Sequence, residues 1–201
     1  MTPQARALQD VLRPVDALVI GASAGGVQAF MQLFTGLRAD FRLPIVALLH
    51  LPADRESRLA ETFNQRLALP AREARDKEPI AASTIYFAPP GYHLSIEKDF
   101  SFSLSGEAPV LHARPSIDVL MASAADVYGP RLAGILLTGA SADGAAGLTQ
   151  IARQGGLSIV QDPAQAQMPV MPAAAIAMHE PDLVLSLREI HHCMKLLGAP
   201  R

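Results

Sequence analysis

A serine stands in the middle of a glycine-rich turn near the start of the chain. The stretch DALVIGASAGGVQAF, residues 16–30, places Ser23 in a Gly-x-Ser-x-Gly pattern between an apolar run and a segment with helical spacing. Small neighbours allow the sharp strand-to-helix turn that exposes a nucleophilic hydroxyl. Similar turns bind phosphate through backbone N–H groups, or simply let a helix pack closely on a sheet. The motif alone therefore leaves three interpretations open.

The glycine spacing disfavours a phosphate site. Gly21, Gly25 and Gly26 give the pattern G-x-x-x-G-G rather than G-x-G-x-x-G, and the Lys-Ser/Thr pair of a P-loop is missing. A dinucleotide-binding fold also needs an acidic residue after its second strand, where this chain has His50. Nucleotide binding stays as an alternative interpretation.

A nucleophilic serine needs a base, because the pKa of its hydroxyl lies far above neutrality. His50 directly follows the apolar run PIVALL, and Asp143 is the only acid in GILLTGASADGAAGL. Each residue also has a structural interpretation, His50 as a packed side chain and Asp143 as the N-cap of the helix that begins GAAGL. Since the carboxyl ends of parallel strands meet at one edge, the pattern favours a Ser23–His50–Asp143 triad.

Short apolar runs alternate with helical patterns along the chain, which is typical of an α/β protein with a parallel sheet. We expect a three-layer, doubly wound, mainly parallel sheet with an antiparallel hairpin at 92–106, and Pro-rich site walls at 89–91 and 163–172. The predicted strands are residues 17–20, 44–49, 84–88, 133–138, 157–160 and 183–185. The predicted helices are residues 25–37, 54–69, 116–129, 143–156, 171–179 and 187–197.

Composition excludes several classes of protein. Half of the 201 residues are apolar and the net charge is −2, so the chain has no basic footprint for nucleic acid. No segment reaches the roughly 20 apolar residues of a membrane span, and the N-terminus lacks a signal-peptide core. The single Cys193 fits a reducing, cytoplasmic compartment. The run His191-His192-Cys193 lacks metal-ligand spacing, so we expect neither a metal nor a cofactor.

Several motifs in order resemble those of the CheB-type protein-glutamate methylesterase domain of bacterial chemotaxis. They cover the chain from about residue 16 to 186, whereas the order Ser, His, Asp does not match ordinary α/β-hydrolases. The matching stretches are VIGASAGGVQAF, HLPADRESRLAETFN, IYFAPPGYHL, RPSIDVLMASAA, GILLTGASADGAAGL and IVQDPAQAQMPVMPAAAI.

The resemblance implies a hydrolase that removes methyl esters from glutamate side chains of chemoreceptor helices and also deamidates glutamines there. It implies a Ser23, His50 and Asp143 triad, with backbone N–H groups near Ala24 and Ala140 as the oxyanion site. It also implies a catalytic domain at 16–198 after an extension or short helix at 1–15, and methylated receptor helices in the cytoplasm as partners, with no direct membrane insertion.

The sequence departs from the family pattern at several positions. Ala24 replaces a common Thr, Ala140 a common Met and Val170 a common Gly, and Ala113 precedes Arg114 where the family has His, with His112 one place early. These changes affect the expected pocket shape and rate. The family also carries a receiver domain; without one, activity would be constitutive or set by a separate regulatory protein. A non-catalytic relative with a modified pocket stays as an alternative.

Overall fold

The computed structural model describes residues 11–51 and 57–199. Its main sheet is seven-stranded, in the order β3-β4-β2-β1-β7-β8-β9, and every pairing in it is parallel. All carboxyl ends therefore lie at one edge. The strands are β1 Ala17–Ala22, β2 Ile45–Leu49, β3 Ala71–Glu73, β4 Ile85–Phe87, β7 Leu132–Leu136, β8 Leu157–Gln161 and β9 Leu183–Leu185.

Both faces of this sheet are buried, because successive side chains of a strand point to opposite faces. In β1, Leu18 and Ile20 belong to one hydrophobic cluster and Ala17 and Val19 to the other. A strand that is apolar at every position is what a sheet covered on both sides requires. This explains the continuous apolar runs in the sequence.

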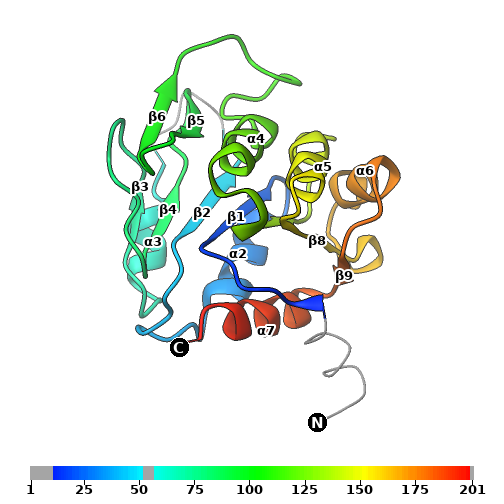
Figure 1. Ribbon diagram of the computed structural model, residues 1–201, viewed down its shortest axis with the longest axis horizontal. Helices are drawn as coiled ribbons and strands as arrows, with labels where there is room; N and C mark the ends of the chain where they lie inside the picture. Colours follow the sequence, from blue (N-terminus) through cyan, green and yellow to red (C-terminus); the bar gives the residue numbers. More distant parts are fainter. Residues whose placement is uncertain (1–10, 52–56, 200–201) are drawn as a thin grey trace.

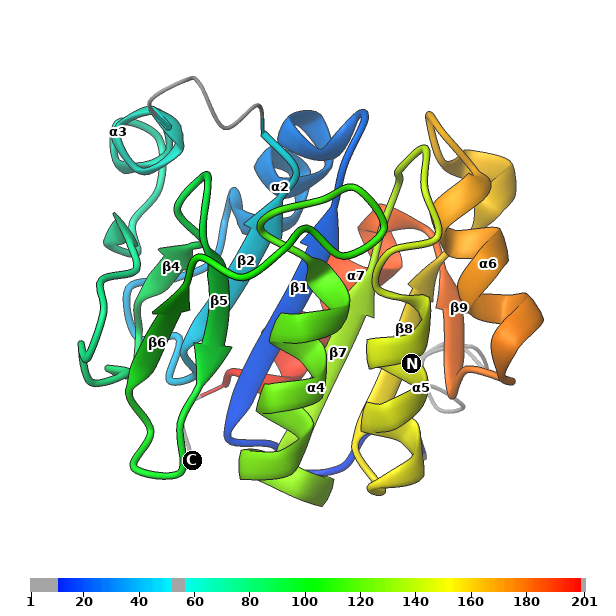
Figure 2. The same ribbon diagram turned by 90° about the horizontal axis from the view of Figure 1, so that it is seen from above.

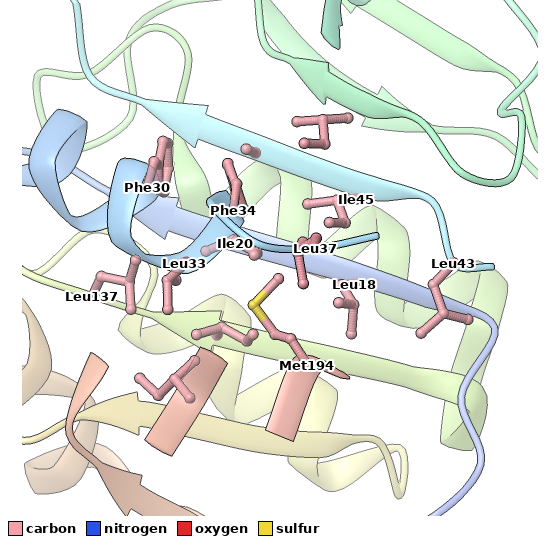
Figure 3. Close-up of a cluster of buried hydrophobic side chains, with 14 of the residues drawn as sticks. Leu18, Ile20, Phe30, Leu33, Phe34, Leu37, Leu43, Ile45, Leu137 and Met194 are labelled. Carbon is pink, nitrogen blue, oxygen red and sulfur yellow. The ribbon is translucent and has the colours of Figure 1, made fainter. Parts of the chain in front are cut away.

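Helices form the two outer layers. Those on one face are α2 Gly26–Phe34, α3 Leu59–Asn64 and α7 Leu187–Leu197, and those on the other are α4 Ile117–Tyr128, α5 Ala145–Arg153 and α6 Val170–Met178. Figure 1 shows α4, α5 and α6 on one side of the strands and α2 and α7 on the other. Side chains of α2 and α7, including Phe30, Leu33 and Met194, pack against β1 and β2 in Figure 3. The predicted three-layer, doubly wound architecture is confirmed.

An antiparallel hairpin covers part of the second face. Its strands β5 His93–Ile96 and β6 Phe102–Ser105 pair in antiparallel register, and Leu94, Ile96 and Phe102 join the cluster that contains α4 and α5. The hairpin predicted at 92–106 is therefore present. In Figure 2 the segment between β6 and α4 runs back toward the edge at which β1 and β2 end.

The structure differs from the sequence-based expectation at a few elements. The first strand extends to Ala22, two residues beyond the predicted end, and β3 was not predicted at all. Only Ala71 of its three residues is buried, so β3 shows no apolar run. The helix expected at 54–69 covers only Leu59–Asn64, and residues 54–56 of that prediction lie outside the described residues. Residues 1–10 of the extension expected at 1–15 also lie outside them.

Strand β1 lies where the chain changes direction across the sheet. The chain passes from β1 to β2 and onward to one edge, and then returns to β7 on the other side of β1. In open α/β sheets, ligands bind beyond the carboxyl ends of the strands at such a switch point. A ligand-binding site is therefore expected at the residues that follow β1, β2 and β7.

Candidate active site

Ser23 and His50 leave the carboxyl edge from neighbouring strands. The backbone N–H of Ser23 donates to the carbonyl of Thr138 at 2.9 Å, and that of His50 donates to Ala22 at 3.3 Å. The sheet ladder thus continues one step beyond β1 and β2. This continuation fixes both residues at the switch point.

The turn after Ser23 depends on glycine. Gly25 has φ 82°, in the left-handed region that side chains disfavour, and a Cβ there would lie 2.6 Å from Oε1 of Gln167. The next glycine, Gly26, approaches Leu49 so closely that a Cβ would lie 2.4 Å from its Cδ1. The glycines therefore bring α2 down onto the sheet directly behind Ser23.

His50 and Asp143 form a hydrogen-bonded pair. Nε2 of His50 lies 2.8 Å from Oδ2 of Asp143, whose side chain is fully buried, whereas 17% of the His50 side chain is exposed. A carboxylate only accepts hydrogen bonds, so Nε2 carries the hydrogen and Nδ1 carries the free lone pair. The pair therefore leaves His50 able to accept a proton at Nδ1.

The Asp143 carboxylate also caps helix α4. It accepts hydrogen bonds from the Ser116 hydroxyl at 2.8 Å and from the backbone N–H groups of Ile117 at 2.7 Å and Asp118 at 3.0 Å. Burial alone would raise the pKa of Asp143, but the hydrogen bonds from His50 and from these α4 donors outweigh it and lower the pKa. Asp143 is therefore held as an anion at a helix N-terminus.

Asp118 makes the reciprocal contact. Its Oδ1 accepts from the N–H of Gly144, the N-cap of α5, at 2.9 Å and from that of Gly147, in the first turn of α5, at 2.7 Å. Burial raises the pKa of Asp118, and the neighbouring charge of Asp143 adds to the increase. The interpretation of Asp143 as the cap of its own helix is therefore wrong. Asp118 caps α5, and Asp143 caps α4.

Ser23 and His50 line one pocket of about 480 Å³. Ser23 is half-buried, and its hydroxyl makes no hydrogen bond to any residue within 11–51 or 57–199. In free enzymes, the hydrogen bond between a nucleophilic hydroxyl and its base is often long, and it shortens only when substrate binds. The other lining residues are Leu51, Pro109, Leu111, His112, Ala113, Arg114, Pro115, Ala140 and Ser141.

The pocket wall differs from the expected one. Residues 109–115, between β6 and α4, form much of the lining, whereas neither 89–91 nor 163–172 contributes to it. Val170, one of the departures from the family pattern, is the first residue of α6 and is 47% exposed. Met168 instead supports the site from outside, through hydrogen bonds to Thr138 and Gly139.

The two predicted oxyanion residues lie differently. Ala140 lines the pocket, whereas Ala24 is an exposed residue of the Ser23 turn and its carbonyl accepts from the Thr138 hydroxyl at 2.8 Å. The backbone N–H groups of Ala24 and Ala140 have no acceptor in the part of the chain that the structure describes. Both N–H groups are therefore unoccupied donors among the described residues, and only Ala140 of the two belongs to the pocket lining.

Sequence reasoning missed Ser116 and Asp118 as parts of the site. A Ser before a helix with Asp in its first turn is an ordinary N-cap signal, but the partner, Asp143, lies more than 20 residues away in sequence. Buried His93 extends the network, since its Nδ1 accepts from the Ser116 N–H at 3.2 Å and its Nε2 lies 3.1 Å from the Ala108 carbonyl. Such contacts across the fold leave no local signal.

The described residues contain no cluster of three His, Cys, Asp or Glu side chains placed to hold a metal ion. Cys193 is buried in α7, and burial raises the pKa of its thiol to about 12. None of the helices within 11–51 and 57–199 has the length and apolar character needed to cross a bilayer.

Comparison with solved structures identifies the same fold. The catalytic domain of the Thermotoga maritima CheB methylesterase superposes with a TM-score of 0.86 at 27% identity, covering 92% of this chain and all of that one. The class of protein is thus a doubly wound α/β domain with its polar site at the carboxyl edge.

Comparison of sequences gives the family. The family model described as CheB methylesterase matches residues 18–194. A Leptospira interrogans protein, provisionally named protein-glutamate methylesterase/protein-glutamine glutaminase, is 43% identical over 87% of this chain and 91% of its own length. A Hahella chejuensis protein of the same name is 38% identical over 93% of this chain, which spans 53% of that protein. The chain belongs to the CheB methylesterase family.

Proposed function

We propose that this protein is a serine hydrolase that removes methyl esters from glutamate side chains of chemoreceptor cytoplasmic helices and deamidates glutamines at such sites. The observation that carries the proposal is the buried Asp143, hydrogen-bonded at 2.8 Å to His50, which shares a pocket with Ser23. The names of the relatives supply the substrate class.

In the first half-reaction, the Ser23 hydroxyl attacks the γ-carbonyl carbon of the ester. Its proton passes to Nδ1 of His50, because Nε2 already donates to Asp143. The carbonyl oxygen becomes an oxyanion, which the N–H groups of Ala24 and Ala140 stabilise. His50 then protonates the departing methoxide, so methanol leaves and a glutamyl-Ser23 ester remains.

In the second half-reaction, water replaces methanol. His50 accepts a proton from the water as its oxygen attacks the glutamyl carbonyl, and the same donors hold the second oxyanion. The bond to Ser23 breaks, Ser23 recovers its proton from His50, and a free glutamate side chain leaves. With a glutamine substrate the first leaving group is ammonia, and the same steps give a deamidated product.

Asp143 keeps the imidazole in the productive tautomer and stabilises its charged form. The α4 N–H groups that hold Asp143 as an anion supply the electrostatic part of this role. The chemistry needs neither a metal nor a cofactor. We place the reaction in the cytoplasm, where the receptor helices with their modified glutamates would be the partners.

Labelling with a serine-reactive phosphonate, together with methanol release from a methylated chemoreceptor fragment, tests the proposal. We expect stoichiometric labelling of Ser23 in the wild type and none in Ser23→Ala, with labelling at least 100-fold slower in His50→Gln. Labelling without methanol release would support the non-catalytic alternative. Saturable nucleotide binding without labelling would support the nucleotide-binding alternative and refute the hydrolase.

A further inference from the structure

A two-residue turn at the pocket rim carries backbone strain. Leu111 and His112 have φ of 47° and 64°, and the flanking residues Val110 and Ala113 exchange hydrogen bonds of 3.1 and 2.8 Å. Two consecutive positive φ values define a type I′ turn, for which Asn-Gly is the preferred sequence. A bulky Leu in that conformation is an outlier, and such strain is characteristic of functional segments.

The segment around this turn is held firmly. The Arg114 guanidinium donates to the carbonyls of Gly106 and Glu107, both at 2.9 Å. His93, from β5, lies 3.1 Å from the carbonyl of Ala108. The backbone on either side of the turn is thus fixed, and the strained tip is presented in one place rather than as a loose loop.

The turn exposes its side chains beside Ser23. Leu111 is 55% exposed and lines the same pocket as Ser23 and His50, as does His112. A large exposed apolar side chain on a strained backbone contributes little to folding. Its position therefore points to a contact with a molecule that enters the pocket.

We infer that Leu111 and His112 form a docking element for the protein segment that carries the glutamyl ester. This inference deepens the proposed function and rests on it. A glutamate side chain is short, so placing its ester carbon on Ser23 brings the neighbouring residues of the substrate against the rim. The described pocket lining includes the cation Arg114 and no acidic side chain, so it suits an acidic, glutamate-rich segment with an apolar residue for Leu111.

The test compares two substrates: a methylated chemoreceptor cytoplasmic fragment and the small ester N-acetylglutamate γ-methyl ester. The variants are Leu111→Asn and the double variant Leu111→Asn/His112→Gly, which relieve the strain while removing the exposed side chains. We expect kcat/KM for the receptor fragment to fall roughly tenfold or more relative to kcat/KM for the small ester, since one buried apolar contact is worth about that much. The thermal midpoint should not fall.

Ser83→Asn is the matched control. Ser83 also has positive φ, 56°, but it precedes β4 at the opposite edge of the sheet. Its replacement should change neither the ratio of the two activities nor the fold. Equal losses on both substrates in the Leu111 variants, or no loss on the receptor fragment, would overturn the docking role. A wild type that releases no methanol from either substrate would refute the proposed function itself.

Discussion

The tetrapeptide Gly-Ala-Ser-Ala occurs twice in the chain, at 21–24 and 139–142, and each copy joins a buried strand to a helix. In the first copy, Gly and Ala are the last residues of β1, so Ser23 is the first residue beyond the strand. In the second copy the strand β7 has already ended at Leu136, before the tetrapeptide begins. The same four residues therefore have different conformations.

The two turns end alike but differ by one inserted residue. Each reaches its helix through a left-handed glycine N-cap, Gly25 with φ 82° and Gly144 with φ 95°. In the first turn the glycine follows the tetrapeptide directly, whereas in the second Asp143 comes between. The Ser23 hydroxyl has no hydrogen-bond partner among the described residues, whereas the Asp143 carboxylate accepts four hydrogen bonds. The serines of both copies line the pocket, and the residue inserted in the second turn, Asp143, binds the start of α4.

The largest expected effect is that of Ser23→Ala. If Ser23 is the nucleophile, methanol release from the receptor fragment should fall by roughly four orders of magnitude or more, as in other serine hydrolases. Ser141→Ala, the same change in the second copy, should retain at least 100 times the activity of Ser23→Ala. A Ser23→Ala rate within tenfold of wild type would remove the proposed difference between the turns.

Asp143→Asn should lower kcat by about three to four orders of magnitude while the protein stays folded, because an amide can donate to Nε2 and so stabilise the wrong imidazole tautomer. Steady-state kinetics with circular dichroism as a fold control would measure this. Near-normal kcat in a folded variant would mean that Asp143 acts only as the α4 cap.

The effect of acid on stability tests the charge on Asp143. Because the pKa of Asp143 is lowered in the folded protein, its ionised form contributes stability that is present above the unfolded-state pKa of about 3.9. That contribution is lost as the pH falls through the lower folded-state value. Urea unfolding should therefore show a larger loss of unfolding free energy for wild type than for Asp143→Asn between about pH 5 and pH 2. Parallel profiles would contradict the assignment.

Ser141→Ala should have the smallest effect on stability. Its Oγ is shielded from solvent and has no hydrogen-bond partner among the described residues, so removal should leave the free energy of unfolding unchanged or raise it by up to about 1 kcal/mol. Ser116→Ala is the contrast, because it removes a hydrogen bond to buried Asp143 and should cost about 1–2 kcal/mol. Urea titration of both variants measures the difference, and a clear loss in Ser141→Ala would contradict it.

Much of the fold follows from local pattern. Strands such as β1 and β2 are apolar at every position because both faces are covered, and the hairpin alternates because one face is not. The edge strand β3 escaped prediction, since only Ala71 in it is buried. Short edge strands are defined by pairing with a neighbour, here β4, rather than by their own composition.

The site was predictable only in part. Ser23, His50 and Asp143 each follow an apolar strand, and this is why a sequence can indicate that they meet at one edge. That Asp143 accepts from the α4 N-terminus, and that the 109–115 segment forms the wall, depends on how α4 and the hairpin pack. Such contacts form only when the helix layer and the hairpin pack together, so the local sequence around each residue does not indicate them.

The exchange of caps between α4 and α5 has a consequence for how such a protein could lose its activity over evolutionary time. Asp143 and Asp118 each anchor a helix that starts in the other's loop, so a lineage that no longer needed the reaction would still be selected to keep both acids. The Ser23 hydroxyl, by contrast, binds no element in the described part of the chain. In a decaying descendant the hydroxyl would disappear first, and the surviving carboxylates would be a poor guide to whether catalysis persists.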